Sequence, residues 1–319
     1  MVKLTPSTFH SADQMIELKE SIVALATALA CVRGADGSFA RAYEALVEIE
    51  ELIFRHKEAF GVQNALFQQG CEEYILLCNT AAIQHLPHAA ASSDNGELPQ
   101  CGDLLVRAEQ HTRRTGYLRS VSNASHATNR IQLRLLSLNN LACYYKQIGK
   151  PLAAIGFLEE ALEIQLRQLE DHPFGEQATD TSATDDAQEN AIALTHLNLS
   201  AVLSQMKRHD AAAEHARCAT ELLLQAETAG ESIDANLLVV AFYNLAVEAE
   251  HLKDAGRVAA SIDKALAAAR RHALDRDSSE VVRLLEDMRR STRGAKSPRR
   301  SPTSTLRSPS PRTLRQRGW

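Results

Sequence analysis

Residues 138–149 read Leu-Asn-Asn-Leu-Ala-Cys-Tyr-Tyr-Lys-Gln-Ile-Gly, and residues 154–161 read Ala-Ile-Gly-Phe-Leu-Glu-Glu-Ala. Apolar residues in both stretches recur at the three- and four-residue spacing of one face of an α-helix. Small residues such as Ala142 and Ala154 stand beside large ones. Two antiparallel helices can therefore approach closely, and the large side chains fill the remaining space. The two stretches predict a pair of helices joined by a turn.

The same frame of residues recurs along the chain. Counted from Leu141, a small residue stands at +1, alanine at +13, a large apolar residue at +17 and alanine at +20. Leu29, Leu199 and Leu245 begin three further frames without internal gaps. Their positions are Ala30, Ala42, Leu46 and Ile49, then Ser200, Ala212, Ala216 and Ala219, then Ala246, Val258, Ile262 and Ala265. Recurrence of this kind predicts an array of stacked helix pairs.

Two further parts of the array are less regular. A fifth helix pair is expected between residues 61 and 115, with a long linker over residues 87–100 and its second helix over residues 103–114. The first helix of that pair is expected to carry Tyr74, Leu77, Cys78 and Ala81. Residues 278–290 have an apolar face of Val281, Val282, Leu285 and Met288 at helical spacing, and we expect them to cap the last repeat.

The hairpin pattern resembles the tetratricopeptide repeat, in which a large residue, Leu-Gly/Ala and Tyr on one helix precede Ala, a large residue and Ala on the next. Residues 169–173, Leu-Glu-Asp-His-Pro, follow a long second helix and look like the kinesin light chain subtype. The resemblance is good over residues 126–271 and loose in the N-terminal third. It implies an all-α fold, a right-handed α-solenoid of about five antiparallel helix pairs with a C-terminal capping helix. The motor-adaptor role is not carried over, since no heptad coiled coil is evident.

Charge divides the chain into domains of different character. We expect a flexible N-terminus at residues 1–13, the repeat domain at residues 14–293 and a disordered tail at residues 294–319. Residues 289–319 hold ten of the 35 Lys/Arg and none of the 40 Asp/Glu, so an acidic body carries a basic tail. An acidic insert at residues 170–189, expected as a loop, has seven Asp/Glu and no Lys/Arg.

The concave face is where such arrays bind partners, and the first helix of each pair lines it. An asparagine precedes the framing leucine three times, at Asn140, Asn198 and Asn244. The resemblance implies that these amides hydrogen-bond a bound peptide, since an amide both donates and accepts. A structural bond to the neighbouring helix is the alternative. Residues two and five beyond the leucine share that face and are Cys143, Lys146, Ala201, Ser204, Val247 and Glu250.

No catalytic or cofactor pattern stands out. The chain has no phosphate-binding loop, no HExxH and no Cys/His set at zinc spacing. We therefore expect neither an enzyme nor a cofactor or metal site. The six scattered cysteines indicate free thiols in a reducing compartment, and the longest apolar run, residues 22–32, is too short to span a bilayer. A cytoplasmic protein is expected, with a cytoskeletal or ciliary association as an option.

The tail is rich in Ser, Pro and Arg, which cannot bury enough apolar surface to fold. Its Ser-Pro pairs resemble proline-directed phosphorylation sites, and they are Ser297, Ser301, Ser308 and Ser310. Three interpretations stay open: a solvated end, attachment to a polyanion such as the microtubule surface, or a latch on the acidic body. Specific nucleic-acid recognition is disfavoured because Trp319 is the only aromatic residue there.

The function predicted from these features is a scaffold or adaptor that binds partner proteins through a concave groove. A rigid structural component of a cytoskeletal or ciliary, microtubule-associated assembly is the alternative. A helical enzyme with an unrecognised site is a weaker third hypothesis, which a buried titrating side chain in a deep pocket would favour.

Overall fold

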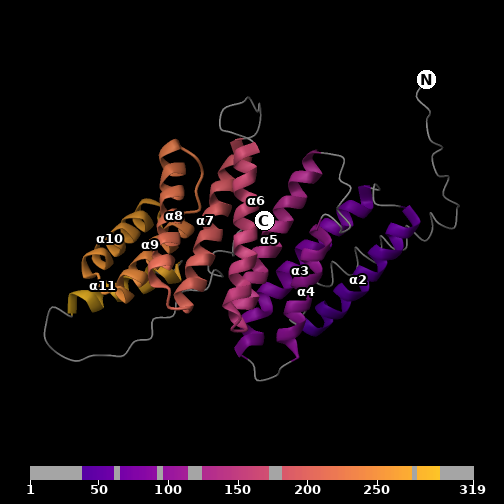
Figure 1. The fold of residues 1–319 in the computed structure, drawn as a ribbon, viewed down its shortest axis with the longest axis horizontal. Helices are drawn as coiled ribbons and strands as arrows, with labels where there is room; N and C mark the ends of the chain where they lie inside the picture. Colours follow the sequence, from indigo (N-terminus) through magenta and orange to yellow (C-terminus); the bar gives the residue numbers. More distant parts are fainter. Residues whose placement is uncertain are drawn as a thin grey trace. The chain divides into compact units, whose positions relative to one another are not determined.

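The computed structural model describes residues 38–60, 65–91, 96–113, 124–171, 182–274 and 279–294. Within these ranges the chain forms ten α-helices and no strand (Figure 1). They are α2 (Phe39–Phe60), α3 (Ala65–Ala91), α4 (Glu97–Thr112), α5 (Ala124–Gln147), α6 (Pro151–Asp171), α7 (Ser182–Gln205), α8 (His209–Ala229), α9 (Ala235–His251), α10 (Ala255–Arg271) and α11 (Glu280–Gly294). The all-α helical repeat predicted from the sequence is confirmed.

The chain divides into two compact units, residues 1–148 and residues 149–319. In unit 1, α2 packs on α3, α3 on α4 and α4 on α5, and α3 also contacts α5. In unit 2, each helix from α6 to α11 packs on the next, and α9 also contacts α7 and α11. Contact between sequence neighbours and between every second helix is the packing expected of stacked helix pairs. The first frame leucine, Leu29, and Ala30 lie outside the described residues.

The frame positions are the residues that hold neighbouring helices together. Every one that the structure describes, from +1 to +20, is buried, and none exposes more than 8% of its surface. The buried set is Ala42, Leu46, Ile49, Ala142, Ala154, Leu158, Ala161, Ser200, Ala212, Ala216, Ala219, Ala246, Val258, Ile262 and Ala265. Small side chains at these positions allow close approach of the helices, and the large ones fill the gaps. The recurrence in the sequence is therefore a packing pattern.

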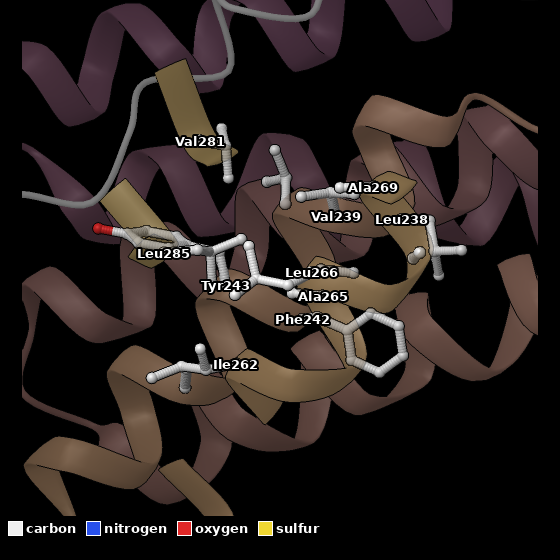
Figure 2. Packing of buried hydrophobic residues seen from close by; sticks show 14 of the residues in the cluster. Leu238, Val239, Phe242, Tyr243, Ile262, Ala265, Leu266, Ala269, Val281 and Leu285 are labelled. Carbon is white, nitrogen blue, oxygen red and sulfur yellow. The ribbon is translucent and has the colours of Figure 1, made fainter. Parts of the chain in front are cut away.

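Helix α9 forms the centre of the core of unit 2 (Figure 2). Its residues from Leu237 to Ala249 are all buried except Leu245, which is partly buried. Tyr243 is fully buried and lies beside α10 and the apolar face of α11. That face consists of Val281, Val282, Leu285 and Met288, each at most 5% exposed. The predicted capping helix is thus present, and it covers apolar surface that α9 and α10 would otherwise expose.

Two expectations about the connections were wrong. Pro87 lies inside α3, and α4 begins at Glu97, so residues 87–100 are not one long linker. A proline removes one helical hydrogen bond, but Leu86 and Ala89 are at most 4% exposed, and their burial favours continuing the helix. The acidic insert is also not a loop throughout, because α6 extends to Asp171 and α7 begins at Ser182.

Candidate interaction surface

The three predicted asparagines occupy equivalent positions on α5, α7 and α9. Asn140, Asn198 and Asn244 expose only 7%, 4% and 7% of their surface. Each lies directly before a frame leucine, on a helix face that turns toward the neighbouring helices rather than to solvent. A buried amide must find hydrogen-bond partners within the fold. Their contact with a bound peptide stays a prediction, and the local partners of Asn140 show a competing role.

Asn140 on α5 forms a hydrogen bond to α3, the first helix of the preceding pair. Its Nδ2 donates to Oδ1 of Asn79 on α3, over 2.7 Å. Asn79 in turn donates through Nδ2 to the carbonyl of Ile75 and to Oγ of Ser137, each at 2.9 Å. This buried network ties α3 to α5. It is the structural bond to a neighbouring helix that the sequence left open as the alternative.

Sequence reasoning missed Asn79, although a signal was present. Asn79-Thr-Ala81 on α3 has the same order as Asn140-Leu-Ala142 on α5, with a polar residue in place of leucine. Helix α3 continues to Ala91, eleven residues past Thr80, whereas α5 ends at Gln147, six residues past Leu141, so the +13, +17 and +20 positions do not align there. The series of buried asparagines therefore begins at Asn79 on α3, two helices before Asn140 on α5.

The residues two and five positions beyond the frame leucine differ in exposure. At the nearer position Ala201 and Val247 are buried, at 7% and 3%, and Cys143 is half-buried. At the farther position Lys146 and Ser204 are half-buried and Glu250 is exposed. Only the farther position offers polar side chains to solvent on all three helices. Lys146 belongs to unit 1, and Ser204 and Glu250 belong to unit 2. Their contact with a partner stays a prediction.

A polar network inside unit 1 joins α2 to α4. Glu50 accepts from Arg107, and its Oε1 lies 2.8 Å from Nε2 of His111. Burial alone would raise the pKa of Glu50, but hydrogen bonds and charge from His111 and Arg107 outweigh it, so this pKa lies below its ordinary value. Arg107 also donates to Asp103 at 2.6 Å. The contacts of Glu50 with Arg107 and His111 join α2 to α4, which makes the network a link between helices.

Two side chains next to this network are chemically inert. Tyr74 and Cys78 on α3 are fully buried, and desolvation raises the pKa of both groups. A thiol held protonated in this way is a poor nucleophile and a poor metal ligand. In the described ranges no three His, Cys, Asp or Glu side chains are placed to hold a metal ion. No helix there is long and apolar enough to cross a membrane.

Comparison with known proteins shows that part of the chain matches a known repeat family. Residues 134–174, which include the second half of α5 and all of α6, match the model of the tetratricopeptide repeat family in its kinesin light chain type. This part of the chain is a tetratricopeptide repeat. The resemblance seen in the sequence is thereby confirmed, and repeats of this kind are typically non-catalytic protein-interaction modules.

Similarity to individual proteins is weaker. The crystal structure of BtubC (BKLC) from P. vanneervenii is similar to this chain at 15% sequence identity and a TM-score of 0.43. The similarity covers 93% of this chain and 99% of that one. No curated protein matches the chain in sequence. The similarity to the tetratricopeptide repeat therefore rests on the match over residues 134–174. The candidate phosphorylation sites Ser297, Ser301, Ser308 and Ser310 lie outside the described residues.

Proposed function

We propose that the protein is a non-catalytic scaffold that binds an extended peptide or a helix of a partner protein along the first helices of its repeats. The observation that carries this proposal is the tetratricopeptide repeat at residues 134–174, in a chain whose other frames bury the same positions. Arrays of this kind use the exposed face of the first helices for binding. Lys146, Ser204 and Glu250 supply polar contacts there.

The mixed chemistry of these positions bears on the kind of partner. Lys146 is basic and Glu250 acidic, with the neutral Ser204 on the helix between them in the sequence. A partner that carries both polar and apolar side chains suits them better than a uniformly acidic tail does. The asparagines support the fold in this proposal, and Asn140 does so through Asn79.

Charge reversal at the exposed positions tests the groove. Proximity labelling in cells would compare the wild-type chain with the double variant Lys146→Glu/Glu250→Lys. The control is Lys264→Glu/Glu221→Lys, which reverses exposed charges on the second helices α10 and α8. Partners that the wild type and the control label should be lost from the double variant. If the double variant keeps every partner, the groove proposal fails.

We extend the proposal to the tail, whose Ser-Pro sites and basic charge support a phosphorylation-tuned attachment to a polyanion such as the microtubule surface. That attachment would place the protein in the cytoplasm near the cytoskeleton. Co-sedimentation with purified microtubules should fall when residues 294–319 are deleted, and should fall with rising salt in the intact chain. Equal sedimentation of both chains would contradict this part.

A further inference from the structure

Two histidines of unit 2 face each other across the contact between α7 and α8. Nδ1 of His196 on α7 lies 2.9 Å from Nδ1 of His215 on α8, and the ring centroids are 5.2 Å apart. Both side chains are partly buried. Neither residue belongs to the repeat frame or to the interaction surface described above.

A hydrogen bond between two imidazole nitrogens requires one donor and one acceptor. One Nδ1 must carry a hydrogen and the other must present a lone pair. When both rings are protonated, each Nδ1 carries a hydrogen, and two positive rings then face each other at hydrogen-bonding distance. The contact can thus accommodate one added proton between the two rings but not a second.

The surroundings of the pair keep both rings neutral near pH 7. Desolvation, followed by the charge of the partner ring, lowers the pKa of His196 to about 4. Desolvation also lowers the pKa of His215, although the carboxylates of Glu214 on α8 and Glu159 on α6 act in the opposite direction. A folded-state pKa below the unfolded value means that stability is lost as pH falls from the unfolded pKa toward the folded one.

The other side of α8 is held by two contacts between a histidine and a carboxylate. Nδ1 of His209, at the start of α8, lies 2.8 Å from Oε2 of Glu248 on α9. Glu227, near the end of α8, lies 2.8 Å from Nε2 of His272 and 2.9 Å from Arg271, at the end of α10. These two contacts tie α8 to α9 and to the end of α10.

We propose that His196 and His215 form a proton-sensitive contact that loosens the packing of α7 on α8 in acid, while His209–Glu248 and Glu227–His272 keep α8 bound to α9 and α10. Unit 2 would then open at one defined place rather than unfold as a whole. This proton-sensitive contact is independent of the proposed partner binding. An experiment that contradicts one of the two proposals therefore leaves the other intact.

Titration of the histidine rings tests the contact directly. In the full chain with 13C-labelled histidine rings, the His196 signal should titrate with a midpoint of about 4. In His215→Asn, which keeps a hydrogen-bonding amide but removes the second ring, that midpoint should rise, because the charge of the partner ring is lost while the larger effect of desolvation stays. A wild-type His196 midpoint near the ordinary value, or one unmoved in His215→Asn, overturns the proposal.

Hydrogen exchange tests where the chain opens. Between about pH 7.5 and about pH 4.5, and after correction for intrinsic rates, amide protection in α7 should fall by roughly fivefold or more relative to α10. The double variant His196→Asn/His215→Asn should lose most of this difference, whereas His88→Asn, an exposed histidine of α3, should keep it. Equal losses of protection in α7 and α10, or the same pattern in the double variant, would refute a localised switch.

Discussion

The interiors of the two units use different means to hold similar helices. Unit 1 places a buried polar network, Glu50 with Arg107 and His111, between α2 and α4, and joins α3 to α5 through Asn79 and Asn140. Unit 2 surrounds α9 with an almost continuous apolar cluster. Hydrogen bonds are directional, whereas apolar contact depends on filled volume. Helices of the same repeat frame can thus be held in position by specific hydrogen bonds or by complementary apolar packing.

The comparison predicts that unit 2 is most sensitive to lost volume. Leu238→Ala removes a fully buried side chain from α9 and should lower the free energy of unfolding by about 3–4 kcal/mol, through lost apolar burial and the cavity left behind. Urea unfolding, with hydrogen exchange in α9 and α10 to localise the effect, measures it. Leu152→Ala on α6, at a side chain 73% exposed, should change stability by less than about 0.5 kcal/mol. Similar losses in both variants would contradict the volume argument.

Unit 1 should be most sensitive to a broken ion pair. Glu50→Gln leaves Arg107 without its buried carboxylate and should cost about 2–3 kcal/mol, because a charge then stays partly buried and poorly compensated. Urea unfolding followed at α2 and α4 measures the loss. Glu221→Gln on α8, an exposed partner of Arg217, should cost about 0.5 kcal/mol or less. Replacing Glu50, Arg107 and His111 together by apolar residues should restore much of the stability, and failure to do so would argue for a specific role of the charges.

The same pair predicts a pH dependence for unit 1. Because the pKa of Glu50 is lower in the folded chain than its ordinary value of 4.5, its contribution is present above that value and is lost as pH falls through the folded pKa. The stability difference between wild type and Glu50→Gln should therefore shrink below about pH 4. Urea unfolding of both chains across pH gives the difference. A constant difference down to about pH 3 would show that the carboxylate charge is not what stabilises the contact.

A smaller effect is expected from the amide network. Asn140→Ala removes the donor to Asn79 and should cost about 1–2 kcal/mol, the usual price of an unsatisfied buried polar group. Asn129→Ala, at an exposed residue of α5 that bonds Glu72, is the matched control and should cost about 0.5 kcal/mol or less. Thermal unfolding compares the two. Equal effects would mean that burial of the network adds nothing to its strength.

Two helix glycines give the smallest and most direct contrast. A Cβ at Gly102 in unit 1 would clash with the ring of Tyr144, so Gly102→Ala should cost about 1 kcal/mol as the ring moves away. A Cβ at Gly156 in unit 2 would meet nothing within 4 Å, so Gly156→Ala should stabilise α6 by about 0.5–1 kcal/mol. Thermal unfolding should show opposite signs. Gly102→Ala in a Tyr144→Ala background should lose its penalty, and a persistent penalty would place the strain elsewhere.

Much of the fold was predictable because it depends on local periodicity. The four gapless frames identified the residues that pack between helices. All the described positions from +1 to +20 are buried, and the frame leucine Leu245 is partly buried. The capping helix was visible in the spacing of Val281, Val282, Leu285 and Met288. The helix end predicted at Pro87 was wrong. Proline usually ends a helix, but α3 continues past Pro87, and the burial of Leu86 and Ala89 favours this. The balance between a lost hydrogen bond and buried area depends on neighbours that the local sequence does not identify.

The candidate surface was predictable only in part. The offset from each frame leucine identifies a helix face, but not which residue on that face neighbouring helices cover. Ala201 and Val247 are covered, while Glu250 is exposed. Asn79 was missed because its helix departs from the frame after its first positions. The exposure of equivalent positions differs because neighbouring helices pack more closely at some repeats than at others. A repeat consensus does not contain that information.

The amino-acid sequence by itself determined that the chain is helical and that its helices form a repeat. Helix periodicity and small residues at fixed offsets are local properties, and they survive any arrangement of the neighbours. Tertiary structure alone decided that Asn140 meets Asn79, that Glu50 meets Arg107 and His111, and that His196 meets His215. Each pair joins residues on different helices, so its distance and protonation depend on packing that only the folded chain creates.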